Sequence, residues 1–168
     1  MISGIDERAS GLATRGLDCG YSPARAVLQE LTLQFREGTF TCVIGSNGVG
    51  KTTLLQTLAG ILTPLAGTAT LSGERIHSLS PVSRARRMSV VLTRLQPPGY
   101  LTVSQFVHLG RHPHQDIFGR FREADRVACE QALEEAGVSH LQDRWLTELS
   151  DGERQRAAIA RGLAQSAE

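Results

Sequence analysis

The sequence predicts an α/β fold, because segments with the pattern of strands alternate with segments with the pattern of helices. Residues 31–35 alternate between apolar and polar side chains, as a half-buried strand does, and a turn follows them. Residues 40–44 and 88–92 are β-prone apolar runs, which suit strands buried on both faces of a parallel sheet. Between these runs, apolar residues recur at helical spacing over residues 54–62.

Shorter elements fill the rest of the chain. Strands end at glycine-containing turns, and helices end at glycine or proline, so both kinds of boundary are visible in the sequence. We expect strands at residues 17–21 and 68–71, one or two helical turns at 81–87, and helices at 103–110 and 124–136. The last of these would be capped by Gly137.

The composition is that of an ordinary globular protein. Of the 168 residues 40% are hydrophobic and the formal net charge is +1, so no basic surface argues for nucleic acid binding. The N-terminal segment has no apolar core, and no later run approaches the roughly 20 apolar residues of a membrane-spanning helix. If a membrane is involved, we expect a partner chain to supply the spans.

The cysteines are too far apart in the sequence to suggest a disulfide framework or a C-x-x-C motif. They are Cys19, Cys42 and Cys129. A reducing compartment fits this usage best. We expect Cys42 and Cys129 to be buried as small hydrophobic residues, since one lies in an apolar run and the other in a helical pattern.

A glycine-rich loop lies between the apolar run 40–44 and the helix that follows, and it matches the pattern G-x-x-x-x-G-K-[ST]. Such a loop turns its backbone N–H groups towards a polyphosphate, and the helix N-terminus adds partial positive charge. Lys51 would reach the β- and γ-phosphates of ATP, and the Thr52 hydroxyl would bind Mg²⁺. The predicted ATP-binding residues here are Gly45, Ser46, Asn47, Gly48, Val49, Gly50, Lys51, Thr52 and Thr53.

A second motif, L-S-D-G-E-R-Q at residues 149–155, precedes an alanine-rich helical stretch. Ser150 and Glu153 have the S-x-x-E spacing of a capping box, which would fix the start of a helix. The segment also resembles the signature motif of the ABC ATPases, at the distance from Lys51 that this family shows. Asp151 stands where the commonest form of the motif has glycine, and we do not expect it to be a ligand.

The resemblance implies a P-loop NTPase core of the ABC type, with an N-terminal antiparallel β part and an α-helical subdomain. The regions would be 1–93 (β part and P-loop core), 94–148 (Q-loop region and helical subdomain) and 149–168 (signature and its helix). In this family the signature, here Ser150, Gly152 and Glu153, binds the γ-phosphate of ATP held by a second subunit. A head-to-tail homodimer with ATP and Mg²⁺ at its interface is therefore implied.

Two further positions follow from the resemblance. Tyr21 precedes the loop where ABC ATPases place an aromatic residue that stacks on adenine, and a buried core tyrosine is the alternative. The Q-loop would follow residues 88–92, with Arg94 at the position of the glutamine. Gln96 is the other candidate for that role.

The segments 101–103 and 109–114 resemble the helical subdomain of importers for siderophores, haem and cobalamin. This implies ATP-driven import of an iron chelate, haem or cobalamin at the cytoplasmic face of a bacterial inner membrane. The implied partners are transmembrane permease subunits and, indirectly, a periplasmic or surface binding protein. His112 and His114 have metal-ligand spacing, but Pro113 between them makes a rigid helix end the better interpretation.

The motifs that complete catalysis in ABC ATPases follow the signature helix, and the sequence ends at Glu168 before they would appear. The catalytic glutamate, a second Mg²⁺ carboxylate and the switch histidine are not among these residues. The resemblance thus implies that the C-terminal part of the fold is missing, and that these residues alone are insoluble or inactive. The alternatives are a non-catalytic nucleotide-binding module and an ABC ATPase without a transport role.

Overall fold

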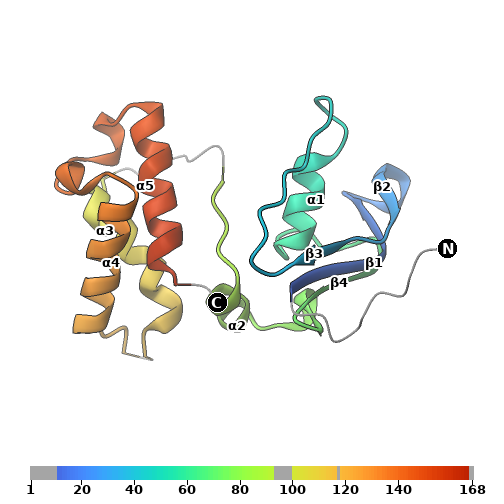
Figure 1. The fold of residues 1–168 in the computed structure, drawn as a ribbon, viewed down its shortest axis with the longest axis horizontal. Coiled ribbons are helices and arrows are strands. Elements are labelled where there is room, and N and C mark those ends of the chain that lie inside the picture. The colour runs from blue at the N-terminus through green and yellow to red at the C-terminus, as the bar shows by residue number, and fades with distance from the viewer. Residues whose placement is uncertain (1–10, 93–99, 117, 167–168) are drawn as a thin grey trace. The chain divides into compact units, whose positions relative to one another are not determined.

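The structure, a computed structural model, describes residues 11–92, 100–116 and 118–166. The chain divides into two compact units, Met1–Ser80 and Pro81–Glu168. The first unit contains an antiparallel sheet and one α-helix, and the second is built from helices alone among its described residues (Figure 1). The predicted antiparallel β part and α-helical subdomain are confirmed.

The sheet of the first unit is organised around one long strand, β1. It has five strands, and β1 pairs antiparallel with three of them while the fifth pairs with β4. The strands are β1 (Gly11–Gly20), β2 (Ala26–Leu31), β3 (Gln34–Arg36), β4 (Ala66–Leu71) and β5 (Glu74–Arg75). A 3₁₀ helix at Pro23–Arg25 joins β1 to β2.

The predicted strand at residues 31–35 is split into β2 and β3 by a side chain of β1. The Thr14 hydroxyl donates a hydrogen bond to the Leu31 carbonyl at 3.0 Å and accepts one from the Leu33 N–H at 2.9 Å. The Thr14 hydroxyl thus takes the place of backbone partners between the two strands at this point. One backbone hydrogen bond remains here, from Thr14 N–H to the Leu33 carbonyl at 2.8 Å. The predicted turn after Arg36 is confirmed.

Helix α1 (Lys51–Leu58) packs against β1 and closes the core of the first unit. Its buried face includes Leu54 and Leu58, and β1 contributes Leu17 and Cys19. Thr57 is also fully buried, and its hydroxyl is satisfied by the Thr53 carbonyl at 2.8 Å. The helix following the glycine-rich loop is thus held by the same strand that organises the sheet.

The second unit packs three helices around one apolar core. They are α3 (Val103–His108), α4 (Glu123–Glu135) and α5 (Asp151–Ala164), which lie side by side in Figure 1. Helix α2 (Pro81–Arg87) precedes them, and 3₁₀ helices lie at Leu109–His114 (η3), Ser139–Leu141 (η4) and Leu146–Glu148 (η5). The largest fully buried side chains of this core are Phe106, Leu146, Val103, Val107, Val138 and Cys129.

The helices expected at 81–87, 103–110 and 124–136 are confirmed, with the second continuing beyond His108 as η3. Gly137 ends α4 with a φ of 66°, a left-handed conformation that glycine adopts without strain. No helix in the described part of the chain is long and apolar enough to cross a lipid bilayer.

The strands predicted at residues 40–44 and 88–92 are wrong: neither segment is assigned as a strand. Phe40 is 96% and Ile44 88% exposed, and Cys42 is exposed rather than buried. The physical reason is that a strand needs a neighbour to accept and donate its backbone hydrogen bonds. No segment among residues 11–92, 100–116 and 118–166 pairs with either run.

Candidate nucleotide-binding site

The glycine-rich loop runs into the first turn of α1 through two left-handed glycines. Gly48 has a φ of 82° and Gly50 a φ of 104°, conformations in which a side chain would be strained. A Cβ atom at Gly50 would also lie only 2.7 Å from Val27 Cγ1. The Gly50 carbonyl then accepts the first helical hydrogen bond, from Leu54 N–H at 2.8 Å. Both glycines are therefore required by the local geometry, as the motif predicts.

Lys51, the only lysine in the sequence, folds its side chain back across this loop. Its Nζ donates hydrogen bonds to the carbonyls of Gly45 and Ser46, both at 2.8 Å. The ammonium group thus lies beside the loop backbone at the N-terminal end of α1, whose first turn contains no acidic residue. Positive charge and the exposed start of a helix meet here, which is an arrangement suited to a phosphate group.

Other predicted residues of this site differ in exposure. Thr52, Asn47 and Val49 are exposed, whereas Thr53 is only 5% exposed and faces the core of the unit. Tyr21 is 65% exposed at the end of β1, so the alternative of a buried core tyrosine is wrong. Stacking of the Tyr21 ring on a base stays a prediction.

The second motif begins α5 with the capping box that the sequence predicts. Ser150 N–H donates to a carboxylate oxygen of Glu153 at 2.8 Å, and the Ser150 hydroxyl donates to the same oxygen at 2.6 Å. Glu153 N–H in turn approaches Ser150 Oγ at 3.4 Å. Hydrogen bonds from the Ser150 hydroxyl and backbone hold the pKa of Glu153 below its ordinary value.

The outer face of this helix end is open. Gly152 is exposed, and a Cβ atom there would meet no atom within 4 Å. Asp151 has a side chain that is 98% exposed and forms an ion pair with Arg154. That Asp151 is not a ligand stays a prediction. The Q-loop candidates Arg94 and Gln96 lie outside the described residues.

The run G-R-H-P-H forms the end of η3, so Pro113 lies in a helical end as predicted. His114 Nε2 is 2.7 Å from the carbonyl oxygen of Gln165, beyond the C-terminal end of α5. Within the described ranges, no group of three or more His, Cys, Asp or Glu side chains is placed to hold a metal ion. Gln165 was not singled out in the sequence, because a polar residue after a helix gives no local signal of its partners.

A family model described as ABC transporter matches residues 28–168. The chain belongs to the ABC transporter family. It is 40% identical over 161 residues to the ferric enterobactin transport ATP-binding protein FepC of Escherichia coli, covering 96% of this chain and 59% of FepC. It is 38% identical over 156 residues to the cobalamin import ATP-binding protein BtuD of Halobacterium salinarum, covering 93% of this chain and 38% of BtuD.

The fold is also that of solved ABC proteins. A metal-chelate type ABC transporter in an inward-facing conformation matches with a TM-score of 0.75 and 29% identity, over 92% of this chain and 56% of that chain. The chain thus spans little more than half the length of FepC and of this solved protein, and less of BtuD. Membership of the family implies ATP binding.

Proposed function

We propose that this chain forms the ATP-binding part of an ATPase subunit that powers import of an iron chelate, haem or cobalamin. The observation that carries the proposal is a pair of helix starts in one chain whose geometry suits an anion. One is the start of α1 with Lys51 across its loop, and the other is the open start of α5 at Ser150. Each offers backbone N–H groups and a hydroxyl or ammonium group to phosphate oxygens.

At the first end, the backbone N–H groups of the loop and Lys51 bind the β- and γ-phosphates of ATP. Lys51 Nζ exchanges its two carbonyl partners for phosphate oxygens, which are stronger acceptors for an ammonium group. The exposed Thr52 hydroxyl is an oxygen donor of the kind that Mg²⁺ prefers. The ion, when bound there, neutralises charge on the phosphate oxygens.

At the second end, Ser150 and the Gly152 N–H bind the γ-phosphate of ATP held by another copy of the chain. The Ser150 hydroxyl donates its hydrogen bond to the Glu153 carboxylate, so it can donate to a phosphate oxygen only after its O–H bond turns towards the ligand. The Glu153 carboxylate keeps its bond from the Ser150 N–H and holds the helix start in place. The result is a head-to-tail homodimer with ATP at the interface.

Transmembrane permease subunits and, indirectly, a periplasmic or surface binding protein complete the transporter, with this chain at the cytoplasmic face of a bacterial inner membrane. The cargo proposal is supported by the names of the relatives, which concern ferric enterobactin and cobalamin. It is also supported by the likeness to a metal-chelate type transporter. No nucleic acid partner is proposed, since the net charge is +1.

The single lysine makes ATP binding directly measurable. Lys51 is the only lysine among these 168 residues, so the mass of the peptide that contains it reports acetylation of this one side chain. We expect saturating ATP with Mg²⁺ to slow acetylation of Lys51 at least about tenfold, because phosphate oxygens hold Lys51 as an ammonium group, which is no nucleophile, more strongly than its two carbonyl partners do. Adenosine, which lacks phosphates, should protect weakly or not at all.

The matched variants are Lys51→Met and Arg25→Met, which each remove one cation from the same unit. Lys51→Met should abolish ATP binding measured by equilibrium dialysis, and Arg25→Met, at an exposed position outside the loop, should retain it. Unchanged acetylation of Lys51 in saturating ATP would contradict the proposed site.

A further inference from the structure

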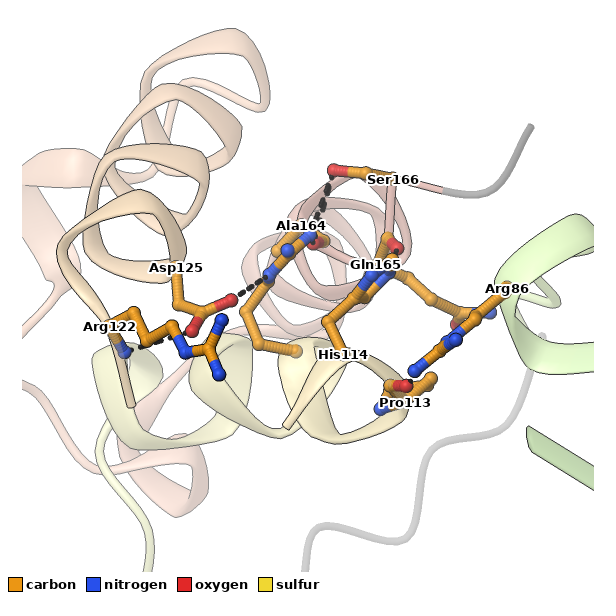
Figure 2. Close-up of polar contacts among 9 residues, drawn as sticks. Arg86, Pro113, His114, Arg122, Asp125, Ala164, Gln165 and Ser166 are labelled. Carbon is orange, nitrogen blue, oxygen red and sulfur yellow. Dashed lines mark hydrogen bonds and ion pairs between the residues drawn. The ribbon is translucent and has the colours of Figure 1, made fainter. Parts of the chain in front are cut away.

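The C-terminal end of α5, opposite to Ser150, is held by two side chains of η3, Arg111 and His114 (Figure 2). Arg111 of η3 donates from Nη1 to the Ala164 carbonyl at 2.9 Å and to Ser166 Oγ at 3.0 Å. A helix leaves its last carbonyls without partners inside the helix, and a guanidinium group complements their partial negative charge. Arg111 therefore caps the end of α5.

Arg111 is itself fixed by an ion pair inside the second unit. Its Nε donates to Asp125 Oδ1 at 2.9 Å, and the two residues are 9% and 4% exposed. Asp125 Oδ2 accepts a second hydrogen bond, from Arg122 N–H at 2.9 Å, at the start of α4. One guanidinium group thus links the end of α5 to the start of α4, and both ions are satisfied although buried.

His114 and Gln165 extend this link to α2. His114 Nε2–H donates to the Gln165 carbonyl at 2.7 Å, which assigns the proton to Nε2 because a carbonyl only accepts. The Gln165 amide donates to the Met88 carbonyl at 2.9 Å and also to the Ala85 carbonyl. Ala85 lies in the last turn of α2 and Met88 directly follows this helix, so the segment after Met88 begins at a point tied to α5.

Neighbouring backbone and side-chain atoms also approach α5 closely at this junction, which leaves little room for the helix to shift. A Cβ atom at Gly110 would lie 2.4 Å from the Arg161 carbonyl oxygen. A Cβ atom at Gly162 would lie 3.0 Å from Val91 Cγ2 and 3.1 Å from Ser89 Oγ. Close packing and directed hydrogen bonds therefore act on the same end of the helix.

We propose that Arg111, His114 and Gln165, here called the α5 clamp, are positioning residues for the signature end of α5. An α-helix of 14 residues is a rod about 20 Å long, so fixing its carbonyl end fixes the direction of its amino end. The clamp thereby sets where Ser150 is presented to the triphosphate held by a second copy. This inference rests on the proposed function, because Ser150 is the point at which the clamp takes effect.

His114 and Gln165 are the positions at which the inference is best tested, because Arg111 and Asp125 are buried and their loss endangers folding. His114→Met removes the donor to Gln165, whereas His114→Gln keeps an N–H donor on a side chain of similar length. Gln165→Met removes the two bonds to α2 at nearly constant volume. His140→Met and Gln131→Met are matched controls at exposed helical positions.

Two affinities are compared for each variant: ATP binding by equilibrium dialysis, and self-association in a slowly hydrolysed ATP analogue by sedimentation. We expect His114→Met and Gln165→Met to weaken self-association roughly three- to tenfold, the effect of one or two hydrogen bonds, with ATP binding unchanged. His114→Gln should restore association, and both controls should match the wild type. If His114→Gln and His114→Met weaken self-association equally, the hydrogen bond of His114 has no positioning role, and the effect comes from side-chain packing alone.

Hydrogen exchange separates this inference from the proposed function. If the wild-type protein does not self-associate in the presence of nucleotide, the proposed function fails. Hydrogen exchange at the amides of residues 150–153 then tests separately whether the α5 clamp positions this end of the helix. Faster exchange there in His114→Met and Gln165→Met, but not in the controls, supports it. Wild-type exchange at these amides in both variants overturns it.

Discussion

At the scale of single residues, the three cysteines show how burial sets chemistry. Cys19 and Cys129 are fully buried, and Cys42 is exposed shortly before the glycine-rich loop. Burial raises the pKa of Cys19, although a hydrogen bond with Thr57 opposes the rise. Burial also raises the pKa of Cys129, to about 11. Thiolate, the reactive form, is therefore scarce at both buried positions.

We predict that only one thiol per native chain reacts with a disulfide reagent at pH 8, and that all three react in denaturant. The measurement is the absorbance of the released thiolate with time. Cys42→Ser should remove the fast reaction and leave the denatured reaction of the other two. A native protein with two or more fast thiols would contradict the burial of Cys19 or Cys129.

The buried pair of Arg111 and Asp125 predicts a dependence of stability on pH. Burial alone would raise the pKa of Asp125, but hydrogen bonds from Arg122 N–H and Arg111 together with the Arg111 charge outweigh it and lower the pKa below 3.8. A lowered pKa in the folded state means that the carboxylate stabilises the fold above pH 3.8. This contribution is lost as the pH falls through the folded-state pKa.

In Asp125→Asn, the unfolding free energy should therefore fall less steeply as the pH drops below 3.8. Near pH 7 this variant should be less stable than the wild type by about 3 kcal/mol, because Arg111 loses its counterion. Urea unfolding across the pH range measures both effects. Glu135→Gln, at an exposed position of the same helix, should keep the acid dependence of the wild type. If Asp125→Asn follows the wild-type acid curve, the ion pair does not have this role.

At the scale of elements, the close approach of η3 to α5 gives a sharp prediction for Gly110→Ala. The new Cβ would lie 2.4 Å from the Arg161 carbonyl oxygen, a backbone atom that cannot move by rotating a side chain. We expect a loss of about 1–3 kcal/mol of unfolding free energy, the usual effect of overpacking. Gly152→Ala, with no atom within 4 Å of its Cβ, should leave stability nearly unchanged. Equal stability of both variants would contradict the packing of η3 on α5.

The helices were predictable because their signals are local. The capping box of Ser150 and Glu153 and the glycine after α4 lie within a few residues of the boundaries that they fix. The runs 40–44 and 88–92 were mistaken for strands, because apolar composition does not show whether a partner strand is present to accept hydrogen bonds. The split between β2 and β3 depends on Thr14, which is distant in sequence.

The contrast between local signals and partners distant in sequence also applies to the candidate site. The loop from Gly45 to Thr52 was predictable, since its glycines and lysine follow one another in the chain. The capping role of Arg111 was not, because its partners Asp125 and Ala164 lie far along the sequence and no pattern marks them. The run G-R-H-P-H gave only a resemblance, and the structure adds the contacts that two of its side chains make.

At the scale of the whole molecule, the two helix ends proposed to bind ATP lie in different compact units of the chain. Lys51 belongs to the first unit and Ser150 to the second. The proposal is that each ATP is bound by Lys51 of one copy and Ser150 of another. The consequence is that a defect in either end can be complemented by a second copy with the opposite defect.

The most direct measurement of this claim mixes Lys51→Met protein with Ser150→Phe protein and follows ATP-dependent dimer formation and ATP retention by rapid filtration. A mixed dimer then contains one interface with an intact loop and an intact signature end, and one interface with neither. We predict that each variant alone retains no ATP in a dimer, and that the mixture retains one ATP per mixed dimer. A mixture as inactive as its separate components would contradict the account, because it would mean that both helix ends must be intact in the same copy.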